Sequence, residues 1–186
     1  MKKTNTLRVL IALAALGVLT MVLTGGGAAA ASTAGKKPTV IKMDRKGKHL
    51  FFTAPATVEA GTNLKIKNRT NPKQVGPHTF SLVKPNDLPT TRNQIKACGK
   101  KLKGLCGAVV KWHDVNVQTG EIGENPVEVG KQGWDRQGSL KRKGDSWVAE
   151  RKGEAFTRKV TAKAGKTLHF FCAVHPEMQG EIEVVE

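Results

Sequence analysis

The sequence predicts an all-β fold, a Greek-key β-sandwich interrupted by a partly helical insertion. Twenty glycines and eight prolines among 186 residues favour frequent turns over long helices. Apolar and charged residues alternate in short runs such as residues 64–67 and 181–184, and this period of two is typical of strands with one buried face. The chain has no Tyr, six Phe and three Trp, so the core is expected to consist mostly of aliphatic side chains.

Several short strands are expected, each ending at a turn. One strand starts directly after Gly76 and Pro77, and Gly61 and Gly165 mark two of the turns. The segment between Trp134 and Trp147 is expected to form a hairpin. The other predicted strands are residues 39–43, 49–54, 64–67, 78–82, 156–162, 168–172 and 180–184.

Residues 85–132 depart from this pattern and are predicted to form the insertion. Residues 91–115 lack the alternation and are rich in Lys, Leu and Val, which indicates one or two short helices interrupted by glycines. Residues 118–132 are rich in turn-forming residues. The insertion is therefore expected to be helical only in its first half.

Residues 1–31 have the pattern of a secretory signal peptide. A basic N-terminus precedes an uncharged apolar run over residues 9–23, and small residues with an Ala-x-Ala cleavage pattern follow. The competing interpretation is an uncleaved anchor, but three consecutive glycines make the run a poor spanning helix. We expect export to the periplasm, the cell envelope or the extracellular space, with a flexible tail at residues 32–38 and one domain at residues 39–186.

The chain is strongly basic, with a formal net charge of +16. Nucleic acid is the first partner to consider for such a charge. Expected export and the scatter of the basic residues argue against it, and basic residues do not interleave with aromatic ones as in RNA-binding motifs. Two interpretations stay open: a solvated basic surface, or attraction to an acidic redox partner or an anionic envelope surface. We expect a monomer.

A cluster of metal-ligand types follows the predicted strand at residues 168–172. Cys172, His175 and Met178 lie within seven residues and supply a thiolate, an imidazole and a thioether. Thiolate and thioether favour Cu(I), imidazole serves both oxidation states, and two His, one Cys and a distant Met form a blue-copper electron-transfer site. The second histidine must come from elsewhere, and His78 is the best candidate because it begins a strand after a rigid Gly-Pro pair.

The remaining histidines fit such a site less well. His169 is an odd neighbour of Phe170 and is expected to point away from Cys172. His49 precedes a strand without a nearby ligand partner, and His113 lies in the insertion. A surface or capping role is predicted for each of the three.

These segments resemble the metal-binding segments of the cupredoxins. The spacing Cys-x2-His-x2-Met, followed by x-Gly, resembles the copper loop of amicyanin and its plastocyanin-like relatives, and Gly-Pro-His resembles the segment with that family's first histidine. The resemblance implies one copper ion held by His78, Cys172, His175 and Met178, carrying single electrons without catalysing a reaction. It also implies that His175 is the electron route and that Met178 tunes the potential.

Two residues depart from the family pattern. Many members have Asn after the first histidine, where it holds the two ligand segments together, and this chain has Thr79. Relatives with a short loop often have an aromatic residue between the His and Met ligands, and this chain has Glu177. The resemblance does not cover residues 85–132.

Other functions stay open at this point. Cys172 and Met178 are also consistent with ordinary core residues, and His175 with a surface residue. The same four ligands would suit a module for copper delivery, storage or protection. A third possibility is an envelope or adhesion domain without metal that uses its basic surface.

Cys98 and Cys106 are predicted to form a disulfide. Eight residues on one straight helix span about 12 Å, whereas a disulfide needs Cα atoms within about 7 Å, so a bend near Gly99 or Gly104 is required. Export favours pairing these two and leaving Cys172 for the metal. A second metal site that uses both cysteines and His113 is the minor alternative.

Overall fold

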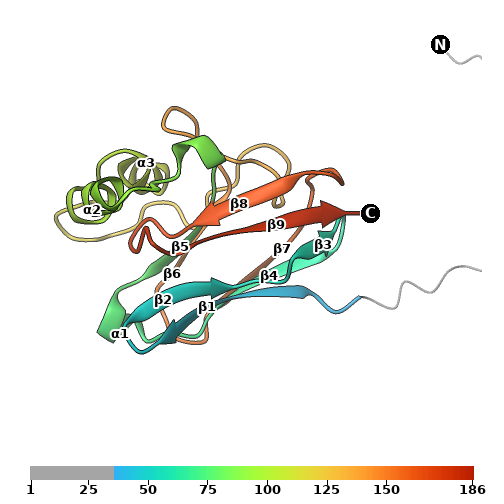
Figure 1. The fold of residues 1–186 in the computed structure, drawn as a ribbon, viewed down its shortest axis with the longest axis horizontal. Helices are drawn as coiled ribbons and strands as arrows, with labels where there is room; N and C mark the ends of the chain where they lie inside the picture. Colours follow the sequence, from blue (N-terminus) through green and yellow to red (C-terminus); the bar gives the residue numbers. More distant parts are fainter. Residues whose placement is uncertain (1–35) are drawn as a thin grey trace, which may run out of the picture. The chain divides into compact units, whose positions relative to one another are not determined.

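The protein folds into two β-sheets that pack face to face, with two helices beside one end (Figure 1). The computed structural model describes residues 36–186, so the predicted signal peptide and the start of the predicted tail lie outside the described residues. No helix within the described part has the length and apolar composition to cross a membrane. The predicted sandwich with a helical insertion is confirmed.

The first sheet has the strand order β2-β1-β4-β7, and the second has the order β3-β9-β8-β5-β6. The pairs β1/β4 and β3/β9 are parallel, and the other neighbours are antiparallel. The strands are β1 (Thr39–Lys46), β2 (His49–Thr53), β3 (Thr57–Glu59), β4 (Asn63–Asn68), β5 (His78–Leu82), β6 (Ser146–Ala149), β7 (Ala155–Lys159), β8 (Thr167–Phe171) and β9 (Gln179–Val185).

Four short helices complete the described fold. The helices are α1 (Pro72–Val75), the 3-10 turn η1 (Pro85–Asp87), α2 (Arg92–Lys101) and α3 (Leu105–Trp112). The last two confirm the predicted helices of the insertion. The sequence patterns did not predict β3, which has only three residues, or α1, which has only four.

The segment between Trp134 and Trp147 reverses direction, but it forms only one antiparallel bridge of the predicted hairpin, between Ser139 and Arg142. Its end is the strand β6, which pairs with β5 and, through Ser146, with Val127. The preceding segment bonds to the end of β5, where Gly138 donates its N–H to Leu82 and accepts one from Lys84. Buried Asp145 accepts three backbone N–H bonds, from residues 129, 135 and 136, and these bonds hold the segment in an irregular path.

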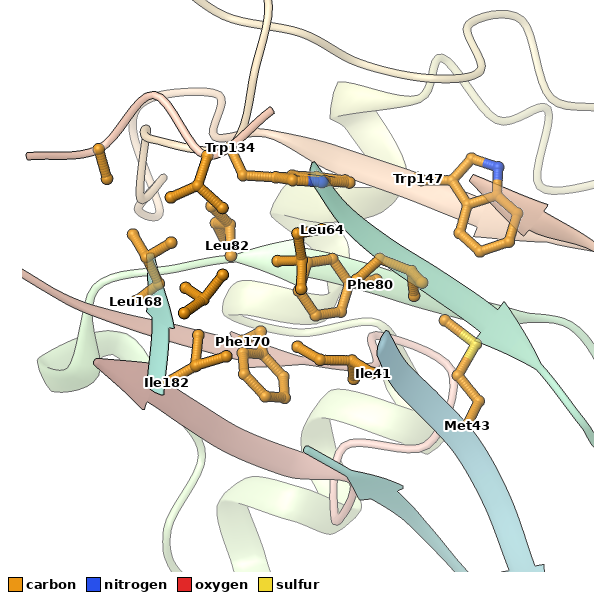
Figure 2. Packing of buried hydrophobic residues seen from close by; sticks show 14 of the residues in the cluster. Ile41, Met43, Leu64, Phe80, Leu82, Trp134, Trp147, Leu168, Phe170 and Ile182 are labelled. Carbon is orange, nitrogen blue, oxygen red and sulfur yellow. The ribbon is translucent and has the colours of Figure 1, made fainter. Parts of the chain in front are cut away.

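The main core fills the space between the sheets. In Figure 2, Ile41, Leu64, Phe80, Phe170 and Ile182 point into this space, and each is at most 1% exposed. The alternation in the sequence places them there, because every second side chain of a strand faces the same side. Burying one such side chain stabilises the fold by about 1.5–3 kcal/mol.

A second, smaller core lies on the opposite face of the sheet β3-β9-β8-β5-β6. It joins the insertion to that sheet through Phe171 of β8, Val109 and Trp112 of α3, and Val83 at the end of β5. Consecutive residues of β8 therefore serve different cores: Phe170 belongs to the sandwich and Phe171 to the insertion.

Candidate metal centre

Two segments bring the predicted ligands together at one end of the sandwich. His78 is the first residue of β5, and residues 172–178 form the loop between β8 and β9, which leaves β8 beside the helices (Figure 1). His78, Cys172 and His175 form the one group of potential metal ligands found among residues 36–186. Because β5 and β8 are neighbours in the sheet, their ends meet and carry these side chains into contact.

The three donor atoms form a triangle of a size that suits a metal ion. Cys172 Sγ lies 3.7 Å from Nδ1 of His78 and 3.7 Å from Nδ1 of His175, and the two Nδ1 atoms are 3.2 Å apart. A point equidistant from the three donor atoms lies about 2.1 Å from each of them. Zinc, the neighbour of copper in the periodic table, has similar bond lengths of ~2.0–2.1 Å to nitrogen ligands and ~2.3 Å to thiolate ligands. The donor set therefore fits one first-row metal ion.

The hydrogen bonds of His78 leave its Nδ1 lone pair free for a metal. The Thr70 hydroxyl donates to Asn68 Oδ1 at 2.8 Å, so its oxygen accepts from Nε2–H of His78 at 2.8 Å. Asn68 Oδ1 also accepts the Thr70 N–H, which fixes the orientation of this amide. A partner on the second nitrogen of a metal-binding histidine sets its tautomer and ring orientation.

The surroundings of both imidazoles favour their neutral forms. Burial, together with the neighbouring His175, lowers the pKa of His78 to about 4. Burial also lowers the pKa of His175, although the Val75 carbonyl and Glu177 act in the opposite direction. Neutral imidazole is the form that binds metal ions.

Cys172 is fully buried and is the one free cysteine among the described residues. Burial raises the pKa of its thiol, whereas N–H groups directed at the sulfur lower it. Two of these donors are the backbone N–H groups of Thr79, at 3.3 Å, and of His175, at 3.4 Å. A cation beside such a sulfur favours the thiolate.

Met178 closes the loop that carries Cys172 and His175. Its N–H donates to the His175 carbonyl at 2.8 Å, and its carbonyl accepts the Cys172 N–H at 3.0 Å. The side chain is 1% exposed and belongs to the sandwich core. The loop therefore holds Cys172, His175 and Met178 in one compact turn, as the sequence spacing predicted.

Thr79, at the position where many cupredoxins have Asn, connects the two ligand segments. Its Oγ1 accepts the Ala173 N–H at 2.8 Å, and its own N–H donates to Cys172 Sγ. One residue thus binds both the cysteine and the residue that follows it. This departure from the family pattern preserves the link between the segments.

Of the surface or capping role predicted for His113, the capping part is confirmed, because His113 is the C-cap residue of α3, but the surface part is wrong. His113 is 1% exposed, and its Nδ1 donates to the Glu124 carbonyl at 2.8 Å. Its Nε2 contacts the Ser146 hydroxyl, which contacts Ser81, and Ser81 in turn reaches Thr79. This chain of buried polar groups, from His113 through Ser146 and Ser81 to Thr79, connects the insertion to the centre.

The other predictions on histidine and cysteine agree with the structure. His169 points away from Cys172 and contacts Glu181 at 3.2 Å, and His49 is exposed. Cys98 and Cys106 form a disulfide with Cα atoms 5.1 Å apart, at the bend that Gly104 makes between α2 and α3. The disulfide occupies both sulfurs and removes the alternative metal site at these residues.

Comparisons with known proteins give distant structural matches. No family model and no curated protein matches the chain. A purple cupredoxin from Nitrosopumilus maritimus matches at 13% identity and a TM-score of 0.38, over 78% of this chain and 98% of its own. Auracyanin A from Chloroflexus aurantiacus matches at 21% identity and a TM-score of 0.37, over 80% of this chain and 99% of its own. Auracyanin B matches at 14% identity and a TM-score of 0.42, over 80% of this chain and 88% of its own.

The protein's own architecture defines its class. Two packed sheets carry one histidine on a strand, and a cysteine, a histidine and a methionine on the loop before the last strand. This is the cupredoxin fold with the residue cluster typical of a type 1 copper site, which confirms the resemblance seen in the sequence.

Proposed function

We propose that this protein binds one copper ion through His78, Cys172, His175 and Met178 and carries single electrons between redox partners. The observation behind the proposal is the triangle of the two Nδ1 atoms and the Cys172 sulfur, with sides of 3.2, 3.7 and 3.7 Å. Two imidazoles, one thiolate and a Met on the same loop are the donor set of blue-copper electron-transfer sites.

When bound, copper supplies one-electron chemistry by alternating between Cu(I) and Cu(II). The chain contributes a preformed set of donors. Thr70 and Asn68 hold the His78 ring, and two backbone N–H groups stabilise negative charge on Cys172. Phe80 and Phe170, both fully buried, keep water from this end of the core.

The two histidines differ in their access to solvent. His78 is completely buried, whereas His175 is half-buried beside Val174, which is 39% exposed. The His175 ring is therefore the proposed route for electrons between the centre and a partner. An enzyme is not proposed, because four protein donors leave no open position for a substrate.

Partner and location follow from charge and from the disulfide. The net charge of +16 supports an acidic redox protein as partner, rather than nucleic acid. The Cys98–Cys106 disulfide is compatible with an oxidising compartment, in line with the proposed export. We propose that the protein acts as a monomer.

Voltammetry of the copper-loaded protein tests the electron-carrier function. We expect a reversible one-electron response, one electron per bound copper, with the metal retained in both oxidation states. Loss of Cu(I) to a chelator or to a copper-free acceptor protein during reduction would contradict the proposal and favour copper delivery. Cys172→Ser is the control and should abolish the response.

A further inference from the structure

A groove lies between the insertion and the loop that carries His175. It has a volume of about 780 Å³, with α2 on one side and residues 174–177 on the other. The half-buried His175 is part of its wall. A molecule seated in this groove would therefore touch the proposed electron route directly.

One wall of the groove carries three positive charges, here called the α2 stripe: Arg92, Lys96 and Lys100. Residues four apart on a helix share a face, so these three lie in a row. All three are exposed, and none takes part in an ion pair within residues 36–186. Glu177 is the one acidic residue among those lining the groove.

Local contacts fix the α2 stripe relative to the loop. The helix begins with a capping box between Thr91 and Gln94, and its Cys98 is joined to α3 by the disulfide. Gly99 faces the loop so closely that a Cβ there would lie 3.2 Å from Pro176. The charged groups are therefore held on a preorganised wall, which lowers the entropic cost of binding.

We propose that this groove is the docking site for a redox protein with a carboxylate-rich protrusion, whose carboxylates pair with the α2 stripe beside His175. The inference rests on the proposed electron-carrier function and adds to it the place and chemistry of the partner. Charge complementarity supports an acidic occupant. The concave shape supports a protein protrusion over an anionic bilayer, which would contact the wider basic surface.

A second basic groove provides a matched control. It has a volume of about 700 Å³ and is lined by Lys131, Lys163 and Lys166, but by none of the proposed copper ligands. Lys163 and Lys166 precede β8, whereas the loop with His175 follows it, so the two grooves lie at opposite ends of that strand. Replacing three cations in either groove changes the net charge equally.

The test measures fluorescence anisotropy of a dye-labelled peptide of ten glutamates on the purified, copper-free protein at low ionic strength. Because it loses three exposed charge pairs, the triple variant Arg92→Gln, Lys96→Gln, Lys100→Gln should bind roughly tenfold more weakly. The matched variant Lys131→Gln, Lys163→Gln, Lys166→Gln should change the affinity less than about threefold, because it acts only through the overall charge. The amide NMR signals of Val174, His175 and Glu177 should shift when the peptide binds.

Equal weakening by the two variants would overturn the proposal, because the peptide would then respond to overall charge. Vesicles of anionic phosphatidylglycerol, used in place of the peptide, should be equally sensitive to both variants. Unshifted loop amides in the bound state would also overturn it. Since the protein contains no copper in this experiment, failure of docking leaves the copper-site proposal intact. Intact docking in a protein that fails to bind copper would refute the redox nature of the partner.

Discussion

The two faces of the sheet β3-β9-β8-β5-β6 are both buried, but by different means. One face packs against the other sheet through a continuous apolar cluster that includes Phe80 and Leu82. The opposite face packs against the insertion through a smaller apolar cluster and through the buried polar chain of Thr79, Ser81, Ser146 and His113. Strand β5 shows the contrast within five residues, since its apolar and hydroxyl side chains alternate between the two faces.

This difference shows which parts of the fold hold the residues of the candidate centre in place. Cys172 belongs to the sandwich core, whereas the next residue, Ala173, belongs to the core of the insertion. The centre therefore lies where the two packed regions meet. Apolar burial supplies most of the stability of such a region, and the hydrogen bonds fix the position of each group.

The largest effect is expected from the apolar face. Phe80→Ala should lower the free energy of unfolding by about 3–5 kcal/mol, because the fully buried ring packs against Phe52, Trp134 and Phe170. Urea unfolding measures this. A loss below about 1 kcal/mol would contradict the packing described for this core.

Removing the disulfide between α2 and α3 tests the packing of the insertion on the opposite face of the sheet. In the double variant Cys98→Ser, Cys106→Ser, the free energy of unfolding should fall by about 2–3 kcal/mol, the value expected for a disulfide that closes a short loop. Hydrogen exchange should show the loss first in α2 and α3, while β1 and β4 stay protected. Uniform loss of protection across both sheets would show that the insertion and the sandwich do not differ as described.

Removing one hydroxyl from the buried polar chain should have a smaller effect. Thr79→Val keeps the shape of the side chain but leaves the Ala173 N–H without its acceptor. The free energy of unfolding should fall by about 1–3 kcal/mol. Thr79→Ser keeps the oxygen and is the matched control. Equal stability of the two variants in urea would show that the bond to Ala173 contributes nothing measurable.

The smallest effect is a pH dependence at His113. Burial lowers the pKa of His113 below 6.5, despite the Glu124 carbonyl and carboxylate, which raise it. A lowered pKa favours the neutral form in the folded protein, so the stability it contributes is full above pH 6.5 and decreases as the pH falls. The stability difference between the protein and His113→Gln should therefore shrink between pH 7.5 and 5. An increase over that range would contradict the burial of neutral His113.

The sequence was sufficient to predict the sandwich and the cluster of His78, Cys172 and His175, but not what surrounds them. Period-two alternation identified most of the strands but not β3, and the short spacing of Cys172, His175 and Met178 identified the loop. The role of His113 depends on Ser146, 33 residues away, and the alternation of β5 shows that Thr79 and Ser81 face outward without showing that the insertion covers them. The groove beside α2 likewise depends on a long-range contact, that of Gly99 with Pro176.

The most direct test of the account is a titration of the purified protein with Cu(II), followed by its visible spectrum. We predict an intense thiolate-to-copper charge-transfer band that saturates at one copper per chain and is absent in Cys172→Ser. Met178→Leu should keep the band and shift the potential. A folded protein that gives no such band, or a Cys172→Ser variant that keeps it, would contradict the assignment of a type 1 copper centre to these residues.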